Sequence, residues 1–277
     1  MRPLPSRLLV VTDRASVPLR GRDGNWLTAR HSGAPEANPE SRTADDAEAG
    51  ETVVSGSGVP LRVPGMTEGE SRTRDGSDVR SSSTIDRGAE DSALLARIDD
   101  LLAGGARWVW FRERDMAPAP RALLARAVLE RVRAGGGRFT LGGDAALAAH
   151  LGADGVHLPG NTTPDAIGHA RRLLPDGLVG VSAHSITEIE TAARSGADYA
   201  TLSPIFATAS KPGYGPALGT DALAAACGHG LPVLALGGIT QDTARACRAA
   251  GATGIAVMGD LMRAPDPAPT LRALLSA

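Results

Sequence analysis

The chain has 277 residues, a formal net charge of -2 and a sequence pI of about 6.3. This balance provides no basic surface for nucleic acid, so we expect no nucleic-acid partner. The spacing of the two cysteines, Cys227 and Cys247, supports neither a zinc site nor a disulfide framework. The first apolar run is too short for a signal peptide or membrane span. We therefore expect a soluble, cytoplasmic protein without membrane contact, and a homo-oligomer stays open.

Short apolar segments alternate with helix-length segments along most of the chain. The predicted strands are residues 8–12, 107–112, 138–141, 155–158, 178–182, 199–202, 233–236 and 254–257. Eight parallel strands, each followed by a helix, are the number that closes a (β/α)8 TIM barrel, an α/β fold. A doubly wound open sheet is the alternative.

Residues 15–88 interrupt this alternation after the first strand. They are rich in Gly, Ser, Asp, Glu and Arg, and Trp26 is their only aromatic residue. Such a segment cannot bury enough apolar surface to offset its chain entropy. We therefore expect the first barrel strand in 1–14, a disordered low-complexity insertion in 15–88, and the rest of the barrel in 89–277. The functional interpretation of this segment is a mobile lid or a regulatory segment, and the alternative is a disordered insertion or an artefact of the gene model.

In TIM barrels the site lies at the C-terminal ends of the strands. Arg112 and Arg114 alternate with Glu113 at the end of the second strand, so both arginines point to one side, which can be the barrel mouth. An ion pair between arginine and Glu113 on the outer face is the alternative. Glycine turns follow the last two strands, where this fold commonly binds phosphate, although they can also be simple tight turns. These turns are Gly237-Gly238 and Met258-Gly259.

The loop after the sixth strand, SPIFATASKPGYG, contains Lys211, the only lysine of the chain. Lysine is a compact point charge suited to phosphate, and Thr208 and Ser210 add hydroxyl donors beside it. A chance surface lysine is the alternative.

Two histidines are candidates for the site: His184 follows the fifth predicted strand, and His157 lies within the fourth. His184 comes two residues after Ser182 at the end of the fifth strand, where an imidazole can exchange protons with a ligand. His157 lies within the predicted strand 155–158, so we expect a hydrogen-bonded residue of the core or the barrel rim.

Seven segments resemble, in order and spacing, the thiamine phosphate synthase/TenI family. They are LLVVTDR, WVWFRERD, GADGVHLP, GVSAHS, SPIFATASKPGYGPALG, LALGGI and TGIAVM. The resemblance implies a TIM barrel that acts in thiamine biosynthesis. Synthases of this family join a hydroxymethylpyrimidine pyrophosphate to a thiazole phosphate and need Mg²⁺.

The resemblance breaks down at the metal positions. The family's Asn-Asp pair after strand three corresponds to Gly142-Gly143, and its second Asp corresponds to Thr162. Glycine and threonine do not provide the charge that a divalent ion needs. Asp144 lies one residue after the family's Asp position and is the candidate substitute ligand. Trp110 stands where the family has a Gln in strand two.

The phosphate half of the pattern is kept, at Thr208, Ser210, Lys211, Gly237, Gly238, Met258 and Gly259. The combination resembles TenI-type thiazole tautomerases, which aromatise a thiazole carboxylate phosphate without metal. We therefore expect a thiazole tautomerase with His184 catalytic and with Arg112, Arg114 and Ser182 also binding substrate. We expect no cofactor. The alternatives are a Mg²⁺-dependent synthase using Asp144 and Asp165, and a non-catalytic protein that binds a phosphorylated ligand.

We predict that Lys211→Ala raises KM for the thiazole phosphate substrate and leaves kcat nearly unchanged. The reason is that the phosphate is held equally in the ground and transition states, so the loss, about 1.5–3 kcal/mol, falls on binding. Steady-state kinetics measures it, with Lys211→Arg as a partial rescue. An unchanged KM would remove Lys211 from the site.

Overall fold

The computed structural model describes residues 2–20, 26–27, 78–208 and 216–277. Ser210 and Lys211 lie outside these ranges. The chain divides into two compact units, Met1–Ala29 with Thr84–Ala277, and Arg30–Ser83. The first unit contains the barrel. Of the second, only the beginning of helix α1 is described.

Eight parallel strands close into a barrel, in the order β1-β10-β9-β8-β7-β6-β5-β4. Their bounds are β1 Leu8–Val11, β4 Trp108–Phe111, β5 Arg138–Gly142, β6 Gly155–Leu158, β7 Leu178–Ala183, β8 Tyr199–Leu202, β9 Val233–Leu236 and β10 Gly254–Val257. Strand β1 pairs with both β4 and β10, which closes the sheet. The predicted (β/α)8 barrel is confirmed, and the open sheet is excluded.

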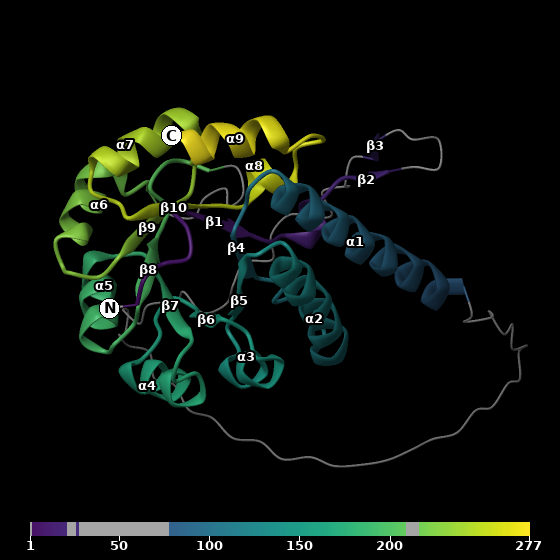
Figure 1. Cartoon of the computed structure of the whole chain (residues 1–277), viewed down its shortest axis with the longest axis horizontal. Helices are drawn as coiled ribbons and strands as arrows, with labels where there is room; N and C mark the ends of the chain where they lie inside the picture. The colour runs from purple at the N-terminus through teal and green to yellow at the C-terminus, as the bar shows by residue number, and fades with distance from the viewer. Residues whose placement is uncertain (1, 21–25, 28–77, 209–215) are drawn as a thin grey trace, which may run out of the picture. The chain divides into compact units, whose positions relative to one another are not determined.

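The helices lie around the strands of the barrel (Figure 1). They are α1 Asp78–Ala103, α2 Pro118–Ala134, α3 Ala145–Leu151, α4 Pro164–Leu173, α5 Ile186–Arg194, α6 Gly219–Cys227, α7 Gln241–Ala249, α8 Gly259–Met262 and α9 Ala268–Ser276. In the part of the chain that the structure describes, none is long and apolar enough to cross a membrane.

Some regular structure lies inside the range 15–88. Strand β2, Leu19–Arg20, pairs antiparallel with β3, Trp26–Leu27, after a short 3-10 turn at Arg14–Ser16. Helix α1 begins at Asp78, before the predicted boundary at residue 88. The three-part domain division itself stays a prediction.

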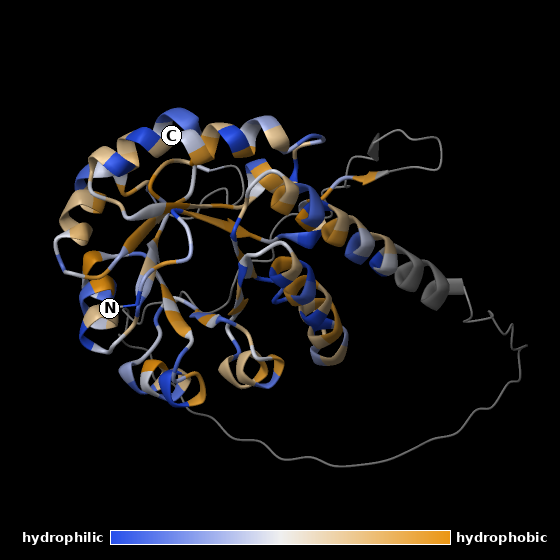
Figure 2. Ribbon diagram, viewed as in Figure 1, coloured by the Kyte–Doolittle hydropathy of each residue, from blue (hydrophilic) through white to orange (hydrophobic). Residues whose placement is uncertain are grey.

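The core has two layers, because successive strand residues face opposite sides of the sheet. One set, including Val10, Val109 and Phe139, packs between the strands and the helices. The other set fills the barrel interior, and it includes Trp108, Trp110, Tyr199, Leu9 and Leu234. The strands are accordingly the most apolar part of the barrel (Figure 2).

The aromatic ring of Tyr199 in the barrel interior leaves space only for glycine at position 180. A Cβ added at Gly180 on β7 would lie 2.2 Å from Cζ of Tyr199 and 2.5 Å from its Oη. Tyr199 is fully buried and also packs edge-on against Trp108, with ring centroids 4.9 Å apart. Position 180 therefore needs glycine because of close packing.

We predict that Gly180→Ala destabilises the barrel by about 1–3 kcal/mol, the usual cost of overpacking a core. Gly168→Ala in helix α4 is the matched control, since its Cβ would have no neighbour closer than 3.6 Å. The control should stabilise the fold by about 0.5–1 kcal/mol. Urea unfolding measures both, and equal effects would contradict the packing argument.

Candidate active site

The position of His184 is fixed by the start of helix α5. Ser185 caps this helix by accepting a hydrogen bond from the Glu188 backbone N–H, at 3.2 Å. In the reciprocal contact, Oε2 of Glu188 accepts from the backbone N–H of His184, at 2.6 Å. The Ser185 and Glu188 pattern predicts a capping box, and the structure places the carboxylate one residue further back than that motif requires. The carboxylate thereby holds the backbone at His184.

The imidazole of His184 has a defined proton arrangement. Its Nδ1 lies 2.7 Å from the backbone carbonyl oxygen of Ser203. A carbonyl oxygen only accepts hydrogen bonds, so Nδ1 carries the proton and the neutral ring has its lone pair on Nε2. A Cβ at Gly160 would lie 3.2 Å from Nε2 and 3.1 Å from Cδ2. The ring therefore packs over the glycine of the loop that follows β6.

His157 lies in the barrel interior. It is fully buried, its Nδ1 lies 3.0 Å from Oη of Tyr199, and its Nε2 lies 3.0 Å from Oγ of Ser182. Its ring lies against Trp110, with centroids 3.8 Å apart. Burial, and then the positive charges of two nearby arginines, lower the pKa of His157 well below its ordinary value. His157 is therefore a neutral core residue, in line with its position within the predicted strand 155–158.

The two nearby cations are Arg112 and Arg114, which follow β4. Desolvation lowers the pKa of Arg114, and the charges of Arg112 and Arg121 lower it further, so positive charge gathers here. Across the described ranges, neither Arg112 nor Arg114 forms an ion pair. Glu113, which lies between the two arginines in the sequence, is buried. Its carboxylate accepts a hydrogen bond from the backbone N–H of Arg14 at 3.2 Å and pairs with neither arginine. This region favours an anion.

The glycine turns after β9 and β10 differ in their surroundings. Gly237 and Gly238 have φ values of +95° and +65°, a region that favours glycine. A Cβ at Gly238 would lie 2.5 Å from the carbonyl oxygen of Ala207, so the loop before Thr208 packs directly on this turn. Met258 precedes α8, and the Arg263 guanidinium lies over Gly259.

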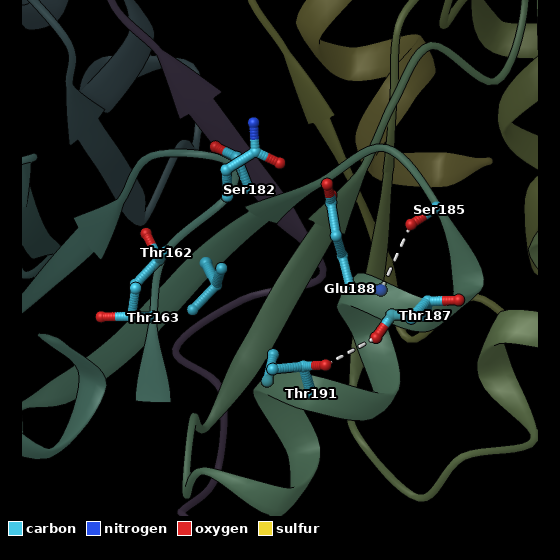
Figure 3. Close-up of a pocket in the computed structure, with 10 residues that line it drawn as sticks. Thr162, Thr163, Ser182, Ser185, Thr187, Glu188 and Thr191 are labelled. Atoms are coloured by element: carbon cyan, nitrogen blue, oxygen red, sulfur yellow. Dashed lines mark hydrogen bonds between the residues drawn. The ribbon is translucent and has the colours of Figure 1, made fainter. Parts of the chain in front are cut away.

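A pocket of about 380 Å³ opens between the loop after β6 and helix α5. Figure 3 shows Thr162 and Thr163 on one side, with Thr187, Glu188 and Thr191 on the other. The other lining residues are Asn161, Val181, Ser182, Ser185 and Ala192. The pocket is rich in hydroxyl groups and adjoins the strand ends that carry Ser182 and His184.

Known proteins match this barrel closely. The family model described as thiamine monophosphate synthase matches residues 83–261. A putative thiamine-phosphate synthase of Geobacter sulfurreducens is 40% identical over 185 residues, 66% of this chain and 86% of that protein. The chain belongs to the thiamine monophosphate synthase family.

Other members and a solved structure agree. The thiamine-phosphate synthase of Chloroflexus aurantiacus is 37% identical over 196 residues, 69% of this chain and 88% of that protein. The structure of a thiamine phosphate pyrophosphorylase from Pyrococcus furiosus is 27% identical, with a TM-score of 0.58, and covers 65% of this chain and 86% of that one. This thiamine monophosphate synthase family member is therefore an enzyme of thiamine biosynthesis.

The family's Mg²⁺ does not fit the residues at its expected positions. Asp144 caps helix α3, because its Oδ1 accepts from the Leu147 backbone N–H at 2.8 Å, and its Oδ2 lies 4.0 Å from Nη1 of Arg121. The hydroxyl of Thr162 donates to the Pro159 carbonyl, and Asp165 is an exposed residue in the first turn of α4. In the described ranges, no three His, Cys, Asp or Glu side chains are grouped to hold a metal ion.

The position of the family's Asn, one residue before the expected metal ligand at Gly143, is closed by packing. A Cβ at Gly142 would lie 2.9 Å from Nε1 of Trp110 and 2.9 Å from the Phe111 carbonyl oxygen. Trp110 thus occupies the space that a side chain at position 142 would need. Its own Nε1 is buried without a hydrogen-bond partner among the residues described.

Arg121 supports the site structurally, and no sequence pattern predicts this role. Arg121 on α2 donates from Nε to the Glu113 carbonyl, at 2.8 Å, and from Nη2 to the Gly142 carbonyl. It is nearly buried and ties the ends of β4 and β5 together. It is one of several arginines in an amphipathic helix, so only its tertiary contacts distinguish it.

We predict that Asp144→Ala lowers the free energy of unfolding by about 0.5–2 kcal/mol, whereas Asp144→Asn has little effect, because Asn caps helices as well as Asp. Chemical denaturation measures stability, and an activity assay on both variants tests the metal role. If Asp144 were a magnesium ligand, the Asn variant would fold normally but lose activity, and the cap interpretation would be wrong.

Proposed function

We propose that this enzyme is a metal-independent thiazole tautomerase, acting on a thiazole carboxylate phosphate with His184 as the acid/base. The observation that carries the proposal is the contact from His184 Nδ1 to the Ser203 carbonyl. It leaves Nε2 as the basic atom, in a half-buried ring at the C-terminal end of β7.

The chemistry asked of this ring is a proton relocation. Nε2 takes a proton from one ring carbon of the substrate, and the imidazolium that forms returns a proton at the other end of the π-system. The substrate becomes aromatic without gaining or losing electrons, so no oxidant is needed. The Ser203 carbonyl stabilises the imidazolium, because its hydrogen bond to Nδ1–H becomes charge-assisted.

The anionic groups of the substrate would be held by the cations and turns of the mouth. Arg112 and Arg114 form no ion pairs within the described ranges and suit the carboxylate or phosphate. The glycine turns and the loop residues are proposed to bind the phosphate. These residues are Thr208, Ser210, Lys211, Gly237, Gly238, Met258 and Gly259. The Ser182 hydroxyl, next to His184 on the same strand face, is proposed to contact the substrate as well.

The second candidate is a thiamine phosphate synthase, which joins hydroxymethylpyrimidine pyrophosphate to thiazole phosphate. The names of the relatives favour it over the tautomerase, since the Geobacter, Chloroflexus and Pyrococcus proteins all carry synthase or pyrophosphorylase names. The donor set around Asp144 and Thr162 argues against its Mg²⁺ site. A protein that binds the phosphorylated thiazole without turnover is the remaining alternative.

One assay of the purified full chain separates these functions. We predict conversion of the thiazole carboxylate phosphate at a rate that is unchanged by EDTA. Formation of thiamine phosphate from the two synthase substrates, dependent on added Mg²⁺, would instead establish the synthase. Calorimetric binding of thiazole phosphate without any turnover would favour the non-catalytic protein.

We also predict that His184→Ala lowers kcat about 10²- to 10⁴-fold with little change in KM, because a proton-transfer group acts mainly in the transition state. His184→Gln can still donate to the Ser203 carbonyl but lacks a basic nitrogen, so it should be as slow. His169→Gln, on the exposed face of α4, is the control with normal activity. Wild-type kcat in the two His184 variants would exclude His184 as the acid/base.

A further inference from the structure

We propose that Thr12 and Glu113 are positioning residues, which hold the end of β4 so that Arg112 and Arg114 form one anion site at the barrel mouth. The inference rests on the proposed function for the use of both arginines in substrate binding. The two side chains follow neighbouring strands, β1 and β4, and each binds the backbone of the other segment.

The two side chains continue the β1–β4 ladder beyond its last regular step. The backbone N–H of Thr12 donates to the Trp110 carbonyl at 3.0 Å, in the parallel pattern of the strands. The backbone N–H of Arg112 then donates to Oγ1 of Thr12 at 2.9 Å, where a regular parallel ladder uses a backbone carbonyl. One step further, the backbone N–H of Arg14 donates to the two carboxylate oxygens of Glu113, each at 3.2 Å. A backbone N–H only donates, so the direction of these bonds is fixed.

Burial makes these bonds hard to replace. Thr12 is 0% exposed and Glu113 is 4% exposed, so water does not compete for either side chain. A buried donor left without its acceptor is costly, which favours the arrangement as it stands. Arg121 adds a third attachment, because its Nε donates to the Glu113 carbonyl at 2.8 Å. Residues 112 and 113 are therefore held from both β1 and α2.

The alternation of side chains along β4 separates the frame from the ligand. Trp110 belongs to the interior layer and Phe111 to the layer that faces the helices. Every second residue of a strand lies on the same side, so Arg112 and then Arg114 continue the interior side, whereas Glu113 continues the helix side. The buried carboxylate thus leaves the mouth to the two guanidinium groups.

The frame matters because the two arginines repel each other. Desolvation, and then the positive charge of Arg112, lower the pKa of Arg114. None of the ion pairs among the described residues includes either arginine. A loose loop would let the like charges separate and would have to bring them together for each anion. Held at the end of β4, the pair is ready for a carboxylate or phosphate before the ligand arrives.

Binding of inorganic phosphate to the full chain tests the positioning role without turnover. Thr12→Val keeps the size of the side chain and removes the acceptor of the Arg112 N–H, so the Kd for phosphate, measured by titration calorimetry, should rise about 10-fold. Thr12→Ser restores the hydroxyl and should restore the affinity. Glu113→Gln removes the charge and one acceptor oxygen, and it should also raise the Kd.

Thr140→Val is the matched control for Thr12→Val. It likewise removes a buried hydroxyl that accepts one N–H, from Nε1 of Trp108 at 2.9 Å. Thermal unfolding should show that both variants lose stability, whereas only Thr12→Val should weaken phosphate binding. Equal phosphate affinities in Thr12→Val and Thr140→Val would overturn the positioning role of Thr12, and a wild-type Kd in Glu113→Gln would overturn that of Glu113. Wild-type affinity in the double variant Arg112→Ala, Arg114→Ala would overturn the anion site itself.

Kinetics links the frame to the substrate. Thr12→Val should raise KM for the thiazole carboxylate phosphate by about the same 10-fold factor and change kcat much less, since the anion is held equally in the ground and transition states. The expected phosphate affinities with an unchanged KM would overturn the role in substrate binding. The same affinities in an enzyme that does not turn over the thiazole substrate would support the positioning role and contradict the proposed tautomerase alone.

Discussion

The closed barrel imposes one constraint on everything at its mouth, which is that polar atoms inside it must find their partners there. His157 satisfies this constraint through both ring nitrogens, with Tyr199 on one side and Ser182 on the other. An unpaired buried polar group costs about 1–3 kcal/mol, so this arrangement is strongly preferred over alternatives. The hydroxyl of Ser182 is thereby hydrogen-bonded to a residue of the barrel interior.

A second constraint couples two positions that lie far apart in the sequence. Trp110 fills the space next to Gly142, so position 142 cannot take the family's Asn without a change at Trp110. The cost is an indole N–H without a partner in the described part of the interior. Restoring a side chain at position 142 would require Trp110 to move or to be replaced, since the new side chain would meet the indole.

Family membership and chemistry depend on different parts of this chain. The fold and the match over residues 83–261 rest on the alternating strands and helices that build the barrel. The reaction depends on a few side chains at the strand ends, which can change while the barrel persists. The relatives carry synthase names, whereas His184 and the cap formed by Asp144 support proton transfer without metal. The two lines of inference therefore disagree on the reaction and agree on the family.

The sequence by itself determined the barrel, since the strand at 155–158 and the others were readable as short apolar runs before helices. It also placed His184 and Arg112 at the strand ends, because the chain position of a parallel strand's end fixes its face. It did not determine what Asp144 does, how Tyr199 contacts His157, or that Trp110 closes position 142. Those depend on contacts between residues on different strands and helices, whose distances are set only when the sheet closes and brings its inward side chains together.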